Sequence, residues 1–216
     1  RETMVRNRFR RQGWWGHPTA WQDRAAVMLP GFMHESLDDW GIDVAIVYPS
    51  LGYMVLAILK EPELRQAVIR AYNVMVADMF GPYSDRIIAS GSISLDTPGE
   101  AIELLKHAKS LGLKAVVMNG AIQRPIEADA DWQPVPSRRR YYLDASGVDS
   151  PPDYDPVWKN CQELQFAVAM HTGSMGWPDR SSPTNYVLNH MGHFAQSHHL
   201  AARTLFMGGV TQRFPD

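Results

Sequence analysis

Three times along this chain, a helical pattern ends in a short turn and leads into a run of apolar residues. The three runs occupy residues 44–48, 115–118 and 167–170. Runs that are apolar at successive positions are typical of strands buried on both faces of a parallel sheet. Because helices alternate with these strands, we expect an α/β fold in which a parallel sheet is covered by helices.

Further elements follow from periodicity and from the residues that interrupt it. Residues 86–93 predict another strand, and residues 183–213 are mostly helical by composition. Residues 23–40 are helical by pattern, but Pro30 predicts a kink or a break into two helices. Residues 62–80 predict a helix with apolar side chains at three- and four-residue spacing. Its expected buried face contains Leu64, Ala67, Val68, Ala71, Val74, Met75 and Met79.

Two other helices have recognisable starts. Thr97 is expected as the N-cap of one helix, with Pro98 in the first turn and Glu100 completing a capping box. Gly112 is expected to end that helix. Asp155 opens the helix that precedes the last apolar run.

Polar or loop-forming groups follow the three apolar runs. Tyr48, Asn119 and His171 stand at these strand ends, and Ser174 lies three residues beyond His171. The spacing of the units fits an open doubly wound sheet as well as a barrel, and both folds bind ligands beyond the carboxyl ends of their strands. These four residues are therefore the candidate site.

His171 is the strongest candidate, because a neutral imidazole at a strand end can bind a metal or transfer protons. The alternative is a histidine that hydrogen-bonds within its loop. Tyr48, Asn119 and Ser174 are candidates for substrate binding, although Tyr48 and Asn119 could instead satisfy loop backbone groups. Ser174 lacks the G-x-S-x-G surroundings of an activated nucleophile, and no residue is assigned a catalytic role.

Three other features have simpler interpretations. His190 and His193 share a helix face, with His198 and His199 close behind, and surface histidines of this kind more often lack a metal than bind one. Cys161 lies on an apolar stripe, so we expect a buried small hydrophobic residue and not a nucleophile. Residues 120–153 predict a long irregular loop insertion, which is either a substrate-capping segment or a disordered excursion.

Composition excludes several classes of protein. The chain has 216 residues, a formal net charge of −2 and 45% hydrophobic residues, so we expect a core and no nucleic-acid surface. One cysteine allows no internal disulfide and no CxxC zinc knuckle. No apolar run approaches the ~20 residues that span a bilayer, and no signal peptide is recognisable, so we expect a cytoplasmic protein without a membrane partner.

Several segments, taken in order, resemble one known family. Phe-Ala-Val-Ala-Met-His-Thr-Gly at residues 166–173, preceded by Asp-Pro-Val-Trp at 155–158, resembles the fifth-strand region of the amidohydrolase-related metal-dependent family. That family includes aminocarboxymuconate-semialdehyde decarboxylase and the resorcylate-type decarboxylases. Residues 41–49 and 112–116 are similar to its second and fourth strands, and segments within 199–216 are similar to the approach to its sixth strand.

The resemblance implies a (β/α)₈ TIM barrel with a divalent metal, often zinc, at its carboxyl mouth. In the family, an H-x-H pair on strand one, a histidine on strand five and an aspartate on strand eight hold the metal. His171 matches the strand-five ligand, and no H-x-H occurs in this sequence. A full barrel needs ~250 residues. We therefore expect residues 1–216 to form one domain, incomplete at both ends, with roughly strands two to five and their following helices.

The resemblance also implies an activity. We expect the full-length protein to be a metal-dependent enzyme with a small-molecule substrate. The expected reaction is decarboxylation or hydrolysis of a small carboxylate-bearing compound, and aromatic acids are one class of such compounds. We expect a homo-oligomer and an inactive isolated chain. An alternative is a non-catalytic α/β domain whose late helical segment mediates oligomerisation, since three of the four expected ligands lack counterparts. An open-sheet small-molecule binding protein is disfavoured, because no glycine-rich phosphate loop follows any strand.

Overall fold

The structure is a computed structural model that describes residues 20–50, 52, 59, 61–125, 141–171 and 186–216. Helices and strands alternate over much of this length, as the sequence predicts. In chain order they are α2 (Trp21–Met28), α3 (Pro30–Ser36), β1 (Ala45–Val47), α5 (Pro62–Phe80), the short 3-10 helix η2 (Gly81–Tyr83), β2 (Ile87–Ile93), α6 (Pro98–Ser110), β3 (Ala115–Asn119), β4 (Ile122–Pro125), β5 (Tyr141–Asp144), α7 (Asp155–Glu163), β6 (Ala167–His171), α8 (Tyr186–Met207) and α9 (Val210–Arg213).

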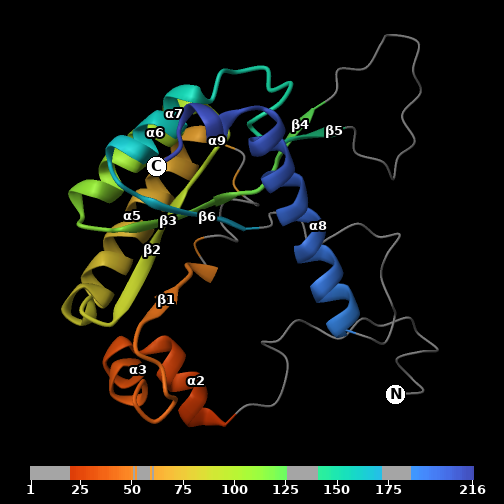
Figure 1. Cartoon of the computed structure of the whole chain (residues 1–216). Coiled ribbons are helices and arrows are strands. Elements are labelled where there is room, and N and C mark those ends of the chain that lie inside the picture. The colour runs from red at the N-terminus through yellow and green to blue at the C-terminus, as the bar shows by residue number, and fades with distance from the viewer. Residues whose placement is uncertain (1–19, 51, 53–58, 60, 126–140, 172–185) are drawn as a thin grey trace.

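Four strands form one parallel sheet in the order β1–β2–β3–β6 (Figure 1). Ala45 pairs with Ile87, Ser90 pairs with Ala115, and Ala115 pairs in turn with Ala167. Each of the four segments predicted as strands forms one of these strands, although β1 is limited to three residues. Parallel strands connected through helices make this α/β sheet a partial (β/α)₈ barrel, which confirms the predicted fold.

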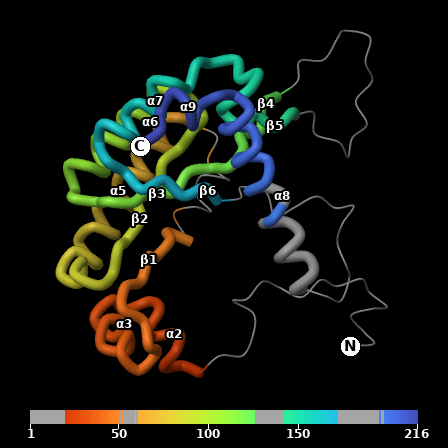
Figure 2. Tube along the Cα trace, viewed as in Figure 1, coloured from red at the N-terminus to blue at the C-terminus, as the bar shows by residue number. Residues whose placement is uncertain are grey.

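Helices α5, α6 and α7 cover one face of the sheet, and Figure 2 follows the chain as it passes from strand to helix and back. The core lies between these two layers, where α6 packs its apolar side chains against β2 and β3. Burying one such side chain stabilises the fold by ~1.5–3 kcal/mol. The largest fully buried members are Ile69, Ile93, Leu95, Leu104, Leu105, Val116, Met118 and Val157.

The opposite face of the sheet carries polar residues. A Cβ atom at Gly91 would lie 3.5 Å from Oδ1 of Asn73 on α5, so Gly91 faces the helix layer. Because strand residues alternate between faces, Ser90 and Ser92 face the other side. The pairing of β2 with β3 places Asn119 on that same side. We call it the inner face, since in a closed barrel it lines the interior.

The predicted buried face of α5 is wrong. The residues that this helix buries are Arg65, Ile69, Asn73 and Val76. Arg65 and Asn73 are polar, so a search for apolar periodicity does not detect them. Each can be buried because it has a hydrogen-bonding partner. Asn73 pairs with the backbone of Ser92: its Nδ2 donates to the carbonyl oxygen at 3.0 Å, and its Oδ1 accepts from the amide at 2.8 Å. The carboxamide thereby satisfies the backbone hydrogen-bonding groups of β2 at Ser92, beyond the residues that pair with β1.

Helix ends agree with the sequence in most places. Pro30 begins α3 and Leu29 separates it from α2, which confirms the predicted break. The Thr97 hydroxyl accepts a hydrogen bond of 3.2 Å from the amide of Glu100, which confirms the N-cap of α6. The second half of the capping box is wrong. Both carboxylate oxygens of Glu100 accept hydrogen bonds from the guanidinium of Arg65, because a bidentate charged pair is stronger than a bond to one amide.

The longest helix in the described part of the chain is α8, with 22 residues. It lies against β6 and continues through Gly209, whose φ of +71° suits glycine, into α9. The helical prediction for the end of the chain is confirmed where the structure describes it. Neither α8 nor another described helix combines the length and hydropathy needed to cross a membrane.

The stretch 120–153 is more regular than predicted. Strands β4 and β5 pair as an antiparallel ribbon, with Ile122 opposite Asp144 and Pro125 opposite Tyr141. The strands are four residues long and contain polar side chains on both faces, so they leave no periodic signal in the sequence. The expectation of an irregular segment is therefore wrong for the ribbon, and residues 126–140 lie outside the described part.

Candidate functional site

Three of the four residues predicted for the site meet at the carboxyl edge of the sheet. Strand pairing sets Asn119 beside His171, and the Gly120 amide donates a 2.8 Å hydrogen bond to the carbonyl oxygen of His171. The Tyr48 ring stands edge-on to the His171 ring, with centroids 6.5 Å apart and an interplanar angle of 89°. Ser174 lies outside the described residues. The roles assigned to all four residues stay predictions.

Asn119 presents a buried hydrogen-bond acceptor at this edge. Its Oδ1 has no hydrogen-bond partner among the described residues, and neither do the hydroxyl oxygens of Ser90 and Ser92 on the inner face. Burying a polar atom without a partner costs ~1–3 kcal/mol. Such atoms are therefore places where a ligand group or an ordered water is expected to bind.

A second imidazole approaches the same edge from α8. Nε2 of His198 donates a hydrogen bond of 2.7 Å to the carbonyl oxygen of Met170, the residue before His171. From the sequence, His198 could only be placed near His190 and His193. Its contact with Met170 joins two distant elements and leaves no local pattern. His190 and His193 belong to α8, but their side chains lie outside the described set.

The described residues fit a metal site in part. His171 can supply one imidazole ligand, and imidazole suits several divalent transition metals. Within the described ranges, however, no group of three or more His, Cys, Asp or Glu side chains could hold a metal ion. A complete site therefore requires ligands from outside the described residues.

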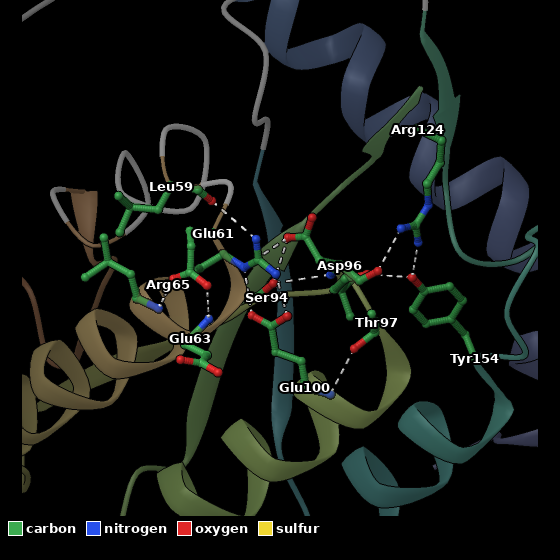
Figure 3. A network of polar contacts seen from close by, with 12 residues as sticks. Leu59, Glu61, Glu63, Arg65, Ser94, Asp96, Thr97, Glu100, Arg124 and Tyr154 are labelled. Atoms are coloured by element: carbon green, nitrogen blue, oxygen red, sulfur yellow. Dashed lines mark hydrogen bonds and ion pairs between the residues drawn. The ribbon is translucent and has the colours of Figure 1, made fainter. Parts of the chain in front are cut away.

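A network of charged side chains, which the sequence did not predict, lies around the segment that follows β2 (Figure 3). Arg65 donates from Nε and Nη2 to the two carboxylate oxygens of Glu100, at 2.8 and 2.6 Å. These side chains are 4% and 2% exposed, so the pair is removed from water. Nε of Arg65 also lies 3.4 Å from Asp96, just beyond β2. The hydrogen bond to Glu100 raises the pKa of Arg65 although burial opposes it.

Arg124 of β4 forms the other part of this network. Its guanidinium donates to Oδ2 of Asp144 at 2.9 Å, to the carbonyl oxygen of Asp96 at 2.7 Å and to the hydroxyl of Tyr154 at 2.6 Å. The Tyr154 hydroxyl donates in turn to the carbonyl oxygen of Leu95 at 2.5 Å. Burial raises the pKa of Tyr154 to about 12, so this phenol stays a neutral donor at physiological pH.

One signal in the sequence could have located part of this network. Glu100 occupies a position on the buried, apolar side of α6, where a charge is rare unless it is paired. Arg65 gives no such signal, because the apolar pattern of α5 indicates a different face. Arg124 leaves no such trace, because it belongs to a short ribbon. Cys161, by contrast, behaves as predicted: it is 6% exposed, and burial raises the pKa of its thiol to about 12.

A match to a known protein family defines the class of protein. The family described as Amidohydrolase matches residues 14–216, which is nearly the whole chain. The chain belongs to this amidohydrolase family, as its resemblance to the metal-dependent decarboxylases and hydrolases implied. A search among curated proteins finds no match.

Solved structures share this fold at low sequence identity. An amidohydrolase from Mycobacterium avium subsp. paratuberculosis K-10 has a TM-score of 0.61 and 19% identity, and the match covers 89% of this chain and 47% of that protein. 2,6-Dihydroxybenzoate decarboxylase from Rhizobium has a TM-score of 0.57 and 22% identity, and the match covers 84% of this chain and 51% of that protein. 5-Carboxyvanillate decarboxylase from Novosphingobium aromaticivorans, solved with bound manganese, has a TM-score of 0.57 and 17% identity. This match covers 99% of this chain and 58% of that protein. The chain thus spans about half the length of these proteins.

Proposed function

We propose that the full-length protein is a metal-dependent enzyme that acts on a small carboxylate-bearing substrate, and that it decarboxylates a hydroxylated aromatic acid. The family supports an enzyme of the amidohydrolase superfamily. Decarboxylation is favoured because two of the similar structures are decarboxylases of hydroxylated benzoates or vanillates. Hydrolysis of a small carboxylate-bearing compound is the competing reaction.

One observation carries the proposal: an imidazole, a buried amide oxygen and a phenol ring meet at the carboxyl edge of a partial barrel. His171, Asn119 and Tyr48 come from three separate strands or strand ends, yet they occupy one face. Carboxyl ends of barrel strands are where enzymes with this fold bind their substrates. A purely structural role for Asn119 would leave its buried Oδ1 without a partner among the described residues, although a buried acceptor needs one.

Each of these residues has a defined task in the proposal. His171 would hold a divalent metal, which when bound polarises a substrate oxygen and stabilises the charge that develops during reaction. Asn119 Oδ1 would accept a hydrogen bond from a substrate hydroxyl group. The exposed ring of Tyr48, beside His171, would contact the aromatic face of the substrate. Ser174 stays a predicted substrate contact.

The metal itself is left open between zinc, which the resemblance implies, and manganese, which one similar structure contains. Imidazole ligands suit zinc, whereas manganese is better suited by carboxylate, carbonyl and water ligands. We also propose, from the sequence alone, that the protein is cytoplasmic and forms a homo-oligomer.

The test uses the full-length protein and two histidine variants. Elemental analysis of the wild type should find stoichiometric metal, and His171→Ala should lose it. His34→Ala is the matched control. His34 pairs with Asp85 on the surface, so this variant should keep the metal. Release of CO₂ from 2,6-dihydroxybenzoate then separates decarboxylation from hydrolysis.

Unchanged metal content in His171→Ala would overturn the metal assignment. Absence of turnover in the metal-loaded wild type with hydroxybenzoates and with carboxylate esters or amides would favour the second candidate, a non-catalytic α/β domain. The observation that favours this candidate is the absence of a three-residue ligand group among the described residues.

A further inference from the structure

Asn119 is held from one side by β6 and leads directly into the ribbon on the other. The amide of Gly120, the next residue, donates to the carbonyl oxygen of His171 at 2.8 Å. The chain enters β4 two residues later, at Ile122. The direction of the Asn119 side chain therefore depends on where the ribbon begins and how firmly the ribbon is fixed.

Arg124 is the residue that fixes the start of the ribbon to the rest of the domain. Its three hydrogen bonds reach Asp144 on β5, the Asp96 carbonyl oxygen beyond β2, and Tyr154 just before α7. The Arg124 side chain is 19% exposed and that of Asp144 is 0% exposed, so water competes weakly for these bonds. Because Tyr154 also bonds to Leu95, two consecutive carbonyl groups at the end of β2 are tied to the ribbon.

The chemistry of this cluster requires arginine. A guanidinium group presents donors in a planar fork, and here the donors separate toward three partners from three elements. A lysine carries the same charge on one nitrogen and cannot reach a carboxylate, a carbonyl and a phenol at these positions together.

We propose that Arg124 is a positioning residue for substrate binding: it holds the turn at Asn119 and Gly120 against the end of β2 and so aims Asn119 Oδ1 at the substrate. This inference rests on the proposed function. The described hydrogen bonds of Arg124 go to Asp144, Asp96 and Tyr154 and not to His171, so its loss should weaken substrate binding without removing the metal. The loss of a well-directed hydrogen bond to the substrate corresponds to about tenfold in affinity, so a rise of about tenfold in KM is expected.

The experiment compares Arg124→Gln and Arg124→Lys with Arg86→Gln in the full-length protein. Arg86 is a matched control at the opposite end of β2, where it bonds to one carboxylate, that of Asp38, and to the carbonyl oxygens of Ile42 and Asp43. With Mn²⁺ bound and 2,6-dihydroxybenzoate as probe, both Arg124 variants should raise KM about tenfold, with a smaller change in kcat. Their metal content should equal that of the wild type, and Arg86→Gln should leave KM unchanged.

A second readout does not depend on activity. Hydrogen exchange of the peptide that carries Gly120 should become faster in both Arg124 variants and not in Arg86→Gln, because the bond to His171 opens more often when the ribbon is loose. Unchanged exchange at Gly120, or a KM equal to that of Arg86→Gln, overturns the positioning role. If the wild type has no turnover, the proposed function fails, and the exchange result alone decides whether Arg124 positions the turn.

Discussion

The buried pair of Arg65 and Glu100 allows a quantitative test of what holds the helix layer together. We consider Arg65→Met, which keeps much of the volume of the side chain and removes its charge. Glu100 would then keep a carboxylate that is 2% exposed but lose both hydrogen bonds from Arg65. An isolated charge at such a position is strongly unfavourable.

The magnitude follows from the burial of both partners. Removing one partner of a buried ion pair destabilises a protein by ~3–5 kcal/mol. In denaturant this loss should lower the midpoint concentration of unfolding without changing the slope of the transition. The double variant Arg65→Met/Glu100→Leu removes both charges, and it should recover to within ~1 kcal/mol of the wild type.

Chemical denaturation of the full-length protein and its variants measures these differences. Lys159→Met is the control, because Lys159 and Glu163 form an exposed pair at 3.7 Å whose loss should cost less than ~0.5 kcal/mol. Equal stability of Arg65→Met and this control would contradict a penalty for the unpaired Glu100 carboxylate. A double variant no more stable than Arg65→Met would contradict it as well, because the cost would then come from packing.

Three further predictions concern positions away from the site. Cys161 should resist thiol reagents at pH 8 in the folded protein, and rapid labelling without unfolding would contradict this. Because its folded pKa of about 12 exceeds the unfolded value, its contribution to stability should be lost as the pH rises from about 9 toward 12. Thr97→Ala should cost ~1 kcal/mol by removing the N-cap of α6, measured by denaturation, and Thr97→Ser should recover most of it. Gly112→Ala should cost ~1 kcal/mol because φ is +78° there, whereas Gly99→Ala meets open space and should be neutral or stabilising; equal melting temperatures for the two would argue against backbone strain.

The strands and the position of the candidate residues at their ends could be predicted because both depend on local patterns. Apolar runs between helices identify the strands, and parallel strands bring their carboxyl ends to one edge. Asn119 and His171 lie side by side for that reason alone. The contact of Tyr48 with His171 did not follow from strand pairing, since β1 and β6 are the two edge strands of the described sheet and only its curvature brings these rings within 6.5 Å.

The parts that escaped prediction depend on partners that are distant in the sequence. Apolar periodicity assigned the wrong face of α5 to the core, because Arg65 and Asn73 are buried by pairing with Glu100 and with the backbone of Ser92. The contact of His198 with Met170 likewise joins residues from two elements. A local pattern carries no information about such contacts, so they become visible only in the folded chain.

The pairing of the strands also sets an order for folding. Ser90 reaches Ala115 across one helix, whereas Ala115 reaches Ala167 across the ribbon and a further helix. The entropy lost on closing a loop grows with its length, and contacts between nearby residues form faster. The unit of β2, α6 and β3 is therefore expected to assemble first, with β1 and β6 added to its two edges. Core substitutions in α6 should then slow refolding, whereas substitutions in β6 should mainly accelerate unfolding.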